Sequence, residues 1–384
     1  MSETPISIDR KDIPIPLNIP SVAGWKEVPI VTDEQPGGDF HLVPLGAFSN
    51  HPRIFTDSIY SGERDSSPYR QDQDLANPQR LAGSLTTMFV RPSVAEALEK
   101  AQVFLPKSHF LIIHDAYRTL QVQGALYEKY HSELGKLHPD WTKEQLATEA
   151  QKFVSLPSSD PKKPSPHNTG GAVDLAIIRV TDDKAKRIKE IEEKIKDLLD
   201  TDLHRYDLEM EMTTIKSHGT YLYFGTPFDH GSGKASLTYF EQLSQERPLT
   251  EEENEAMRNR RLLYHVMEDV GLQAYPDEWW HFNSPKSQMG AKTAGVETAS
   301  FGGIDLSVEN LEHERIRQQH KIGVMRIEDG WQPRHRRSFL DRVLRKNKDP
   351  LARARQAVKK SLQRDGSYIH TSLPESEKIS PQAN

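Results

Sequence analysis

The sequence predicts an α+β fold. Stretches with helical periodicity and short apolar stretches typical of strands both occur, without the regular β-α alternation of a parallel α/β protein. The chain has 384 residues, of which 35% are hydrophobic and 28% charged, and it carries no internal repeat. This length and composition suit a soluble protein with one large domain or two ordinary ones.

The first half of the chain begins with an irregular stretch. Residues 1 to about 52 are rich in Pro and Gly, as in "DIPIPLNIP", which indicates an extended arm. A helix is expected over 91–105, followed by an apolar strand in "HFLIIHDAYR". A second helix is expected over 119–134, with Thr119 as its N-cap, and a loop rich in Pro and Ser follows it.

Two more helices are expected in the second half. The stretch from about 182 to 200 places apolar residues on one helical face (Ile188, Ile191, Ile195, Leu198 and Leu199). Within "PLTEEENEAMRNRRLLYHVMEDVGL", Thr250 and Glu253 fit a capping box, and Gly271 suits the position after a helix end. The apolar stripe of that helix is expected to be buried (Leu262, Leu263, Val266, Met267 and Val270).

Composition excludes several classes of site. The chain has no cysteine, so disulfides, a thiol nucleophile and a zinc site built on cysteine are excluded. A metal would need His, Asp or Glu, and 16 histidines leave this open. Neither a signal peptide nor an apolar run long enough for a bilayer is found, so a cytoplasmic protein without a transmembrane segment is expected.

The net charge of −6 is unevenly distributed along the chain. Residues 334–364 contain twelve Lys or Arg and two Asp, a net charge of +10, and their apolar residues recur at roughly helical spacing. Such a basic stretch could contact an anionic lipid surface, a nucleic acid or an acidic partner. A solvated helix folded on the acidic body, or disorder, is the simpler interpretation and is preferred.

The segment "SPHNTGGAVDLAII", residues 165–178, contains the first candidate site. From Gly171 onward it reads as a buried strand, except for Asp174 at its centre. An unpaired buried carboxylate is costly, so Asp174 is either exposed, protonated or paired with a strongly positive group. The glycines at 170 and 171 would let the chain turn and bring His167 beside Asp174 as a metal-binding pair. A turn-capping or salt-bridged Asp174 is the alternative.

Two other segments carry candidate residues. In "YPDEWWHFN", Glu278 and His281 could supply a proton acceptor and a further metal ligand if the backbone bends near Pro276. Alternatively, the aromatic residues are plain core and Glu278 is a surface charge. In "HDAYRTLQ", Arg118 follows an apolar strand and could stabilise an anionic intermediate, although a strand-end Arg is more often a salt-bridge partner.

Taken together, these segments resemble the zinc D-alanyl-D-alanine dipeptidases associated with vancomycin resistance. "SPHNTGGAVDL" and "DEWWHF" are similar to that family's two metal-binding signatures. "DAYR", "YFGTPFDH" and "NRRLLYHVMEDVGLQAYPDEWWH" resemble three further family segments in the same order. The resemblance implies a small, mostly antiparallel sheet with flanking helices. This is the fold shared with D-alanyl-D-alanine carboxypeptidases and the hedgehog signalling domain.

The resemblance also implies a role for each site residue. Three of them would bind one zinc ion per chain (His167, Asp174 and His281). Glu278 would be the general base that activates water at the zinc and passes the proton to the leaving amine. Arg118 would stabilise the oxyanion. Asp229 would pair with the ammonium group of a small dipeptide substrate, and Ser165 would hydrogen-bond its carboxylate.

On this basis the chain divides into three parts. Residues 1–52 form an N-terminal arm and residues 53–288 a zinc D,D-dipeptidase domain, in which the helix at about 182–200 is an insertion. Residues 289–384 form a linker and a basic C-terminal extension. The expected activity is hydrolysis of D-alanyl-D-alanine or a closely related dipeptide, linked to cell-wall precursor metabolism. The sequence does not indicate an oligomeric state.

Some departures from the family keep alternatives open. Ile54 stands where family members often have a tyrosine near the substrate amine, and Tyr60 where phenylalanine is usual. A D,D-carboxypeptidase that trims peptidoglycan stem peptides is the second enzyme hypothesis. A non-catalytic, zinc-containing binding protein on the same fold is the third, since a fold alone does not fix a function.

Overall fold

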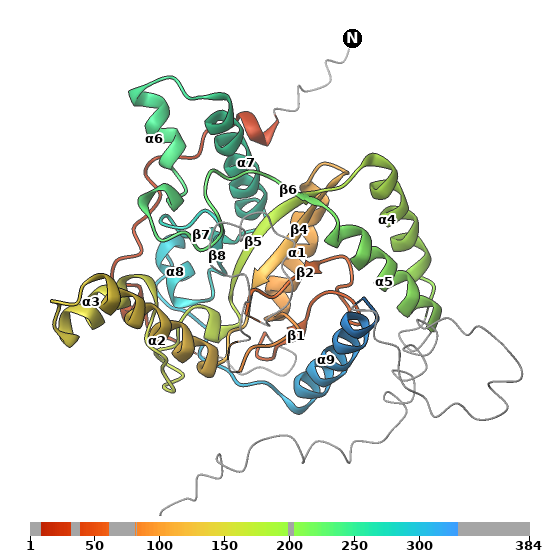
Figure 1. Ribbon diagram of the computed structural model, residues 1–384, viewed down its shortest axis with the longest axis horizontal. Coiled ribbons are helices and arrows are strands. Elements are labelled where there is room, and N and C mark those ends of the chain that lie inside the picture. Colours follow the sequence, from red (N-terminus) through yellow and green to blue (C-terminus); the bar gives the residue numbers. More distant parts are fainter. Residues whose placement is uncertain (1–8, 32–38, 61–80, 82, 199–202, 329–384) are drawn as a thin grey trace, which may run out of the picture. The chain divides into compact units, whose positions relative to one another are not determined.

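The computed structural model describes residues 9–31, 39–60, 81, 83–198 and 203–328 (Figure 1). The chain divides into two units, Met1–Ser307 and Val308–Asn384. In the second unit the described part is helix α9, Val308–Glu328. The basic stretch 334–364 lies outside the described residues, so its predicted surface contacts stay a prediction.

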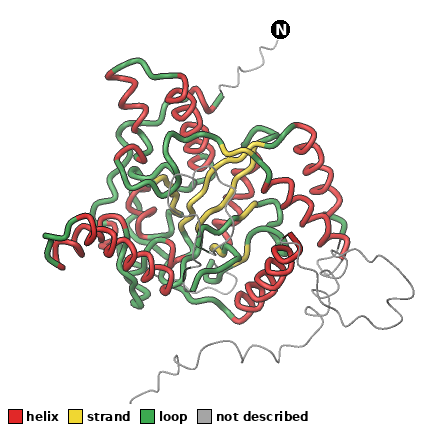
Figure 2. The backbone as a smooth tube through the Cα atoms, viewed as in Figure 1, coloured by secondary structure: helices red, strands yellow, loops and turns green. Residues whose placement is uncertain are grey.

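A mixed sheet forms the centre of the first unit, with strand order β2-β4-β5-β8-β7 and β6 paired to β5 (Figure 2). Only the β2–β4 pair is parallel among the pairs that the described residues form in this sheet. The predicted α+β class and the mostly antiparallel sheet are therefore confirmed. The strands are Phe55–Thr56 (β2), His109–Asp115 (β4), Ala172–Arg179 (β5), Thr220–Tyr221 (β6), Gln273–Ala274 (β7) and His281–Asn283 (β8). A separate antiparallel pair joins Val43–Pro44 (β1) to Phe89–Val90 (β3).

Helices α1 and α7 supply much of the main hydrophobic core. Helix α1, Pro92–Phe104, starts with Pro at its first position, where no backbone donor is lost. Helix α7, Glu251–Glu268, has the predicted capping box of Thr250 and Glu253, and most of its predicted stripe is buried. Gly271 follows with a left-handed φ of 86°. The predicted start and end signals of this helix are confirmed.

Two helical hairpins flank the sheet in Figure 1. Helix α2, Leu120–Leu137, starts at the predicted N-cap Thr119 and packs on α3, Lys143–Phe153, through a small core of its own. Helix α4, Asp182–Ile195, occupies the predicted range and packs on α5, Leu203–Ser217. The isoleucine stripe of α4 joins the main core, so this helix packs on the body of the first unit. Its status as an insertion in the family stays a prediction.

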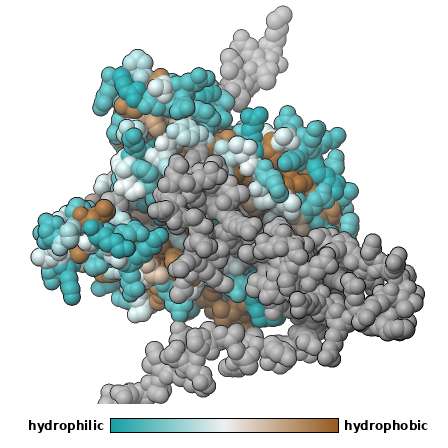
Figure 3. Space-filling view, viewed as in Figure 1, coloured by the Kyte–Doolittle hydropathy of each residue, from teal (hydrophilic) through white to brown (hydrophobic). Residues whose placement is uncertain are grey.

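The outward surfaces of these hairpins are mainly hydrophilic in Figure 3. This agrees with amphipathic helices whose apolar faces turn inward. Among the described residues, no helix combines the length and the apolar character needed to span a bilayer.

The stretches expected to be an arm and a linker are more closely packed than composition suggests. Around the one-turn helix Arg10–Asp12, residues up to Ile15 bind α7 and helix α6, Tyr239–Glu246. Residues Gln288–Ala294 form helix α8, and Phe301 is fully buried. The small residues that resemble a linker permit close approach, since a side chain at Gly290 would collide with the backbone of Ser284. Residues 290–303, interpreted from composition as a linker, thus contain part of a helix and a buried aromatic residue, and the division of the chain at 52 and 288 stays a prediction.

Candidate active site

Strand register gathers the candidate residues on one face of the sheet. Asp174 on β5 lies opposite Asp115 on β4 and opposite His281 on β8. Residues directly opposite each other in antiparallel strands point to the same side. The β4–β5 register shifts between Ile113 and Asp115, which marks a β-bulge at this edge. Such bulges redirect side chains near functional sites.

A tight turn brings His167 to the same point. His167 begins a one-turn helix, His167–Thr169, which ends at Gly170 with a left-handed φ of 69°. A side chain at Gly170 would collide with Leu42, and one at Gly171 would lie 2.7 Å from Phe301. Only glycine satisfies both the backbone angle at 170 and this packing. The predicted return of the chain through the glycine pair is therefore observed.

Three potential ligand atoms converge in the interior. Nε2 of His167 lies 3.3 Å from Oδ2 of Asp174 and 3.2 Å from Nδ1 of His281. The same Nδ1 atom lies 2.7 Å from Oδ1 of Asp174. All three residues are buried, and their ligand atoms lie within 4.8 Å of one another, a grouping that could hold a metal ion.

Hydrogen bonds on the outer side of each imidazole orient the rings. Nδ1 of His167 lies 2.8 Å from the carbonyl oxygen of Ala116, to which it can only donate. Nε2 of His281 lies 3.1 Å from Oδ1 of Asn283. With protons on these outer nitrogens, Nε2 of His167 and Nδ1 of His281 both present lone pairs to the same point. Two imidazole nitrogens and a carboxylate, with no thiolate, form a donor set that zinc accepts.

Asp174 is ionised in this setting. Burial by itself would raise its pKa, but the neighbouring His167 and His281 outweigh that effect and hold the pKa far below its ordinary value. A buried carboxylate that is kept charged in this way requires a compensating positive charge. Protons on the histidines or a divalent cation can supply it.

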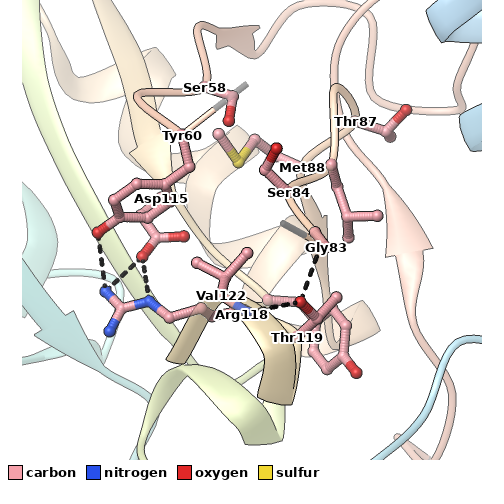
Figure 4. Close-up of a pocket in the computed structure, with 12 residues that line it drawn as sticks. Ser58, Tyr60, Gly83, Ser84, Thr87, Met88, Asp115, Arg118, Thr119 and Val122 are labelled. Carbon is pink, nitrogen blue, oxygen red and sulfur yellow. Dashed lines mark hydrogen bonds and ion pairs between the residues drawn. The ribbon is translucent and has the colours of Figure 1, made fainter. Parts of the chain in front are cut away.

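Arg118 is fixed beside this cluster. Its Nε and Nη2 atoms both donate to Oδ2 of Asp115, at 2.8 and 2.5 Å, and Nη2 also donates to the hydroxyl of Tyr60 (Figure 4). Nη1 donates to Oε1 of Gln123 at 3.1 Å, and Nη2 lies 3.9 Å from Asp174. Burial lowers the pKa of Arg118, but Asp115 and its other neighbours raise it above its ordinary value. Arg118 therefore stays a fixed cation.

Ser165 belongs to a buried ring of hydrogen bonds behind Arg118. Its hydroxyl lies 2.8 Å from Oδ1 of Asn168 and 3.2 Å from Oε1 of Gln123, and Nδ2 of Asn168 donates to the carbonyl of Arg118. The single hydroxyl proton of Ser165 is thus already engaged. Donation to a substrate carboxylate would require that bond to break.

Glu278 reaches the cluster from a turn. Residues 276–280 form turns before β8, so Glu278 and His281 approach the same site although they are three positions apart. Oε2 of Glu278 lies 3.9 Å from Nδ1 of His281, and its side chain is 28% exposed. Burial raises the pKa of Glu278 to about 8, with Asp174 adding to the rise and His281 opposing it. Glu278 is thus a partly accessible acid–base group beside the ligand atoms.

The tryptophans next to Glu278 are core residues. Trp279 and Trp280 are buried, and the indole nitrogen of Trp279 donates to Thr226. That bond ties the Glu278 turn to the segment that carries Asp229. Asp229 is exposed and adopts a left-handed φ of 59°. Desolvation by surrounding atoms, and then Asp174, raise its pKa to about 6.

Sequence reasoning missed three residues of this site: Asp115, Gln123 and Asn283. Asp115 stands in the quoted "HDAYR" segment, yet its position opposite Asp174 follows a shift in the β4–β5 register. Gln123 and Asn283 have no distinctive spacing in the sequence. Conversely, Ile54 is fully buried in the main core and has no surface for a substrate, whereas Tyr60 contacts Arg118.

Comparison with known proteins gives matches that agree with the motifs. Residues 201–298 match the family model of the M15 peptidases, described as D-ala-D-ala dipeptidase. That region includes Asp229, Glu278 and His281. A D-alanyl-D-alanine dipeptidase from Synechocystis sp. is 21% identical over 267 residues, which cover 67% of this chain and 84% of that protein. The resemblance that the motifs indicate is therefore confirmed, and the chain is similar to the D-alanyl-D-alanine dipeptidases of the M15 peptidase family.

Proposed function

We propose that this protein is a zinc-dependent D,D-dipeptidase that hydrolyses D-alanyl-D-alanine or a closely related small dipeptide. The observation that carries the proposal is the buried meeting point of His167, Asp174 and His281, with Glu278 beside it. The relationship to D-alanyl-D-alanine dipeptidases supports the same activity. The fold class agrees with the D-Ala-D-Ala peptidase and hedgehog-like fold proposed for the chain.

One zinc ion per chain would be held by the three converging residues. Nε2 of His167, Nδ1 of His281 and a carboxylate oxygen of Asp174 would be its protein ligands. Three protein ligands leave an open position, as catalytic zinc sites require. When bound, zinc would polarise the scissile carbonyl and make water a better nucleophile near neutral pH.

Glu278 would accept the proton from the attacking water and pass it to the leaving amine. Its carboxylate lies within reach of the ligand cluster but is not one of the converging atoms. A raised pKa and a partly exposed position both suit a base that exchanges protons with a substrate. The positive charge of a bound cation would lower this pKa and keep Glu278 ionised at neutral pH.

Arg118 would stabilise the negative charge that develops on the carbonyl oxygen. A guanidinium carries five N–H groups, and the structure assigns four of them to Asp115, Tyr60 and Gln123. Among the described residues no partner is found for the remaining N–H, on Nη1, which would be the donor to the oxyanion. A donor held in place before the reaction stabilises developing charge without reorganisation.

Asp229 would pair with the ammonium group of the substrate. It is exposed, and its charge contributes to the raised pKa of Glu278, which supports its assignment to the same site. A bound ammonium would lower the raised pKa of Asp229. Ser165 would hydrogen-bond the substrate carboxylate after its hydroxyl releases Asn168.

A dipeptide panel tests this function. Purified protein is assayed on D-Ala-D-Ala, L-Ala-L-Ala and a pentapeptide stem ending in D-Ala-D-Ala, with and without chelator. We expect cleavage of the free D,D-dipeptide, loss of activity with chelator and recovery on addition of zinc. Preferential trimming of the stem would instead indicate a carboxypeptidase, and zinc binding without any hydrolysis would indicate a binding protein.

A further inference from the structure

The side chain of Asn283 is the outer partner of His281. Asn283 is the last residue of β8, is 1% exposed and pairs with both Ala172 and Gln273 in the sheet. Its Oδ1 atom lies 3.1 Å from Nε2 of His281, on the opposite side of the ring from Asp174. Its Nδ2 atom is buried and has no hydrogen-bond partner among the described residues.

An unsatisfied amide nitrogen in a buried position is costly and calls for an explanation. The two ends of the carboxamide have opposite consequences for His281. With the oxygen toward the ring, Nε2 carries the proton and Nδ1 is free to bind a metal. With the nitrogen toward the ring, Nε2 must accept, and the proton moves to Nδ1, where it faces Asp174. The second arrangement blocks the ligand atom.

His167 differs from His281 in this respect. Its outer partner is the carbonyl of Ala116, which can only accept a hydrogen bond, so the proton of His167 is fixed on Nδ1. In the part of the chain that the structure describes, the outer nitrogen of His281 meets the Asn283 side chain and no backbone carbonyl. The choice of ligand atom on His281 thus depends on one side chain.

We infer that Asn283 is a positioning residue that holds His281 in the tautomer whose Nδ1 binds the metal. This inference rests on the proposed zinc site. Asn283 leaves its own Nδ2 unpaired because the oxygen must face the ring. A partner of this kind to a metal-binding histidine typically changes metal affinity by about 10- to 100-fold when it is removed.

Two variants of similar size separate the hydrogen bond from packing. Asn283→Leu removes the acceptor, and we expect it to weaken zinc binding by roughly 10- to 100-fold. Asn283→Asp keeps an acceptor and cannot donate when ionised, so we expect zinc affinity equal to or higher than that of the wild type. Asn259→Leu is a matched control. Asn259 lies on α7, is also buried, and donates a hydrogen bond to the backbone carbonyl of Tyr223 instead of contacting His281. Its zinc affinity should match the wild type.

Zinc affinity is measured by competition with a chromogenic chelator, with thermal melts for each variant. The tautomer of His281 is read from ¹⁵N chemical shifts of the zinc-loaded wild type labelled on histidine. A protonated Nε2 supports the inference, and a protonated Nδ1 overturns it, even if Asn283→Leu does not fold. Unchanged affinity in Asn283→Leu, or a tenfold loss in Asn283→Asp, also overturns it. A wild-type protein that binds no zinc refutes the proposed function instead.

Discussion

Oδ1 of Asp174 lies 2.7 Å from Nδ1 of His281, across the β5–β8 pair, although 107 residues separate them in the chain. The apolar neighbours of Asp174 on β5 make it a costly place for a lone carboxylate. His167 and His281 contact Asp174 and are the groups that can compensate its charge. Both rings direct a nitrogen at Asp174 and at each other, which is the arrangement that the proposed metal site requires.

Asp174→Asn should therefore reduce zinc binding strongly. The amide keeps the size of the carboxylate but removes the negative charge that would complement the cation. We expect at least a tenfold loss of zinc affinity, measured by metal analysis and chelator competition. Asp269→Asn, which breaks a surface pair with Arg10, is the control and should keep its zinc. Full zinc content in Asp174→Asn would contradict its proposed role as a ligand.

Glu278→Gln should keep zinc bound but stop hydrolysis. The amide fills the same space and cannot accept the proton from water, and a general base typically contributes about 10² to 10⁴ in rate. The steady-state rate on D-Ala-D-Ala should fall by this factor, whereas zinc content should stay at the wild-type level. Near-wild-type turnover in Glu278→Gln would refute the assigned base.

Arg118→Lys should lower the rate of hydrolysis more than it raises KM. Lysine keeps the charge but cannot reproduce the fork that binds Asp115 and Gln123 while offering one more N–H to the oxyanion. Loss of one oxyanion donor typically costs about 10² to 10³ in kcat. Arg261→Lys is the matched control, because Arg261 forms a similar paired contact with Glu241 away from the site. A change in KM with normal kcat would indicate a substrate-binding role for Arg118 instead.

The sequence predicted the helices and turns that carry the site better than the contacts between their side chains. Periodicity, caps and glycines located α1, α2, α4, α7 and the turn at Gly170, because these features depend on neighbours in the chain. Asp115 lay outside the prediction because its place depends on strand register and on a bulge. The hydrogen bond from His281 to Asn283 was equally inaccessible, since i and i+2 side chains on a strand give no distinctive pattern.

Amino-acid composition did not predict the close packing of the N-terminal stretch and of the stretch that follows the site. Pro and Gly in residues 1 to about 52 were interpreted as signs of an extended arm, and the small residues of 290–303 as signs of a linker. In the structure, Ile15 and Phe301 are buried, and Glu241 accepts a hydrogen bond from the backbone of Ile15. Such contacts join segments more than 200 residues apart, so no local pattern reports them.

His109 provides a test of stability that does not involve the active site. It begins β4 and is buried, with the cations Lys11 and Arg179 nearby. Burial first, and then these two charges, lower its pKa to about 4 from an ordinary value of 6.5. Between these pH values the unfolded chain binds a proton that the folded protein does not, so acidification destabilises the fold.

His109→Gln should remove this part of the pH dependence. The free energy of unfolding of the wild type, measured by denaturant titration, should fall relative to that of the variant by about 2 kcal/mol between pH 7 and pH 4. Release of zinc and titration of all other groups change the free energy of unfolding of the wild type and of the variant equally. The informative quantity is therefore how the difference between the two free energies changes with pH. The backbone carbonyl at 109, which accepts from Gln102, is kept in the variant. A difference that stays constant across this pH range would show that the folded protein protonates His109 as readily as the unfolded chain does.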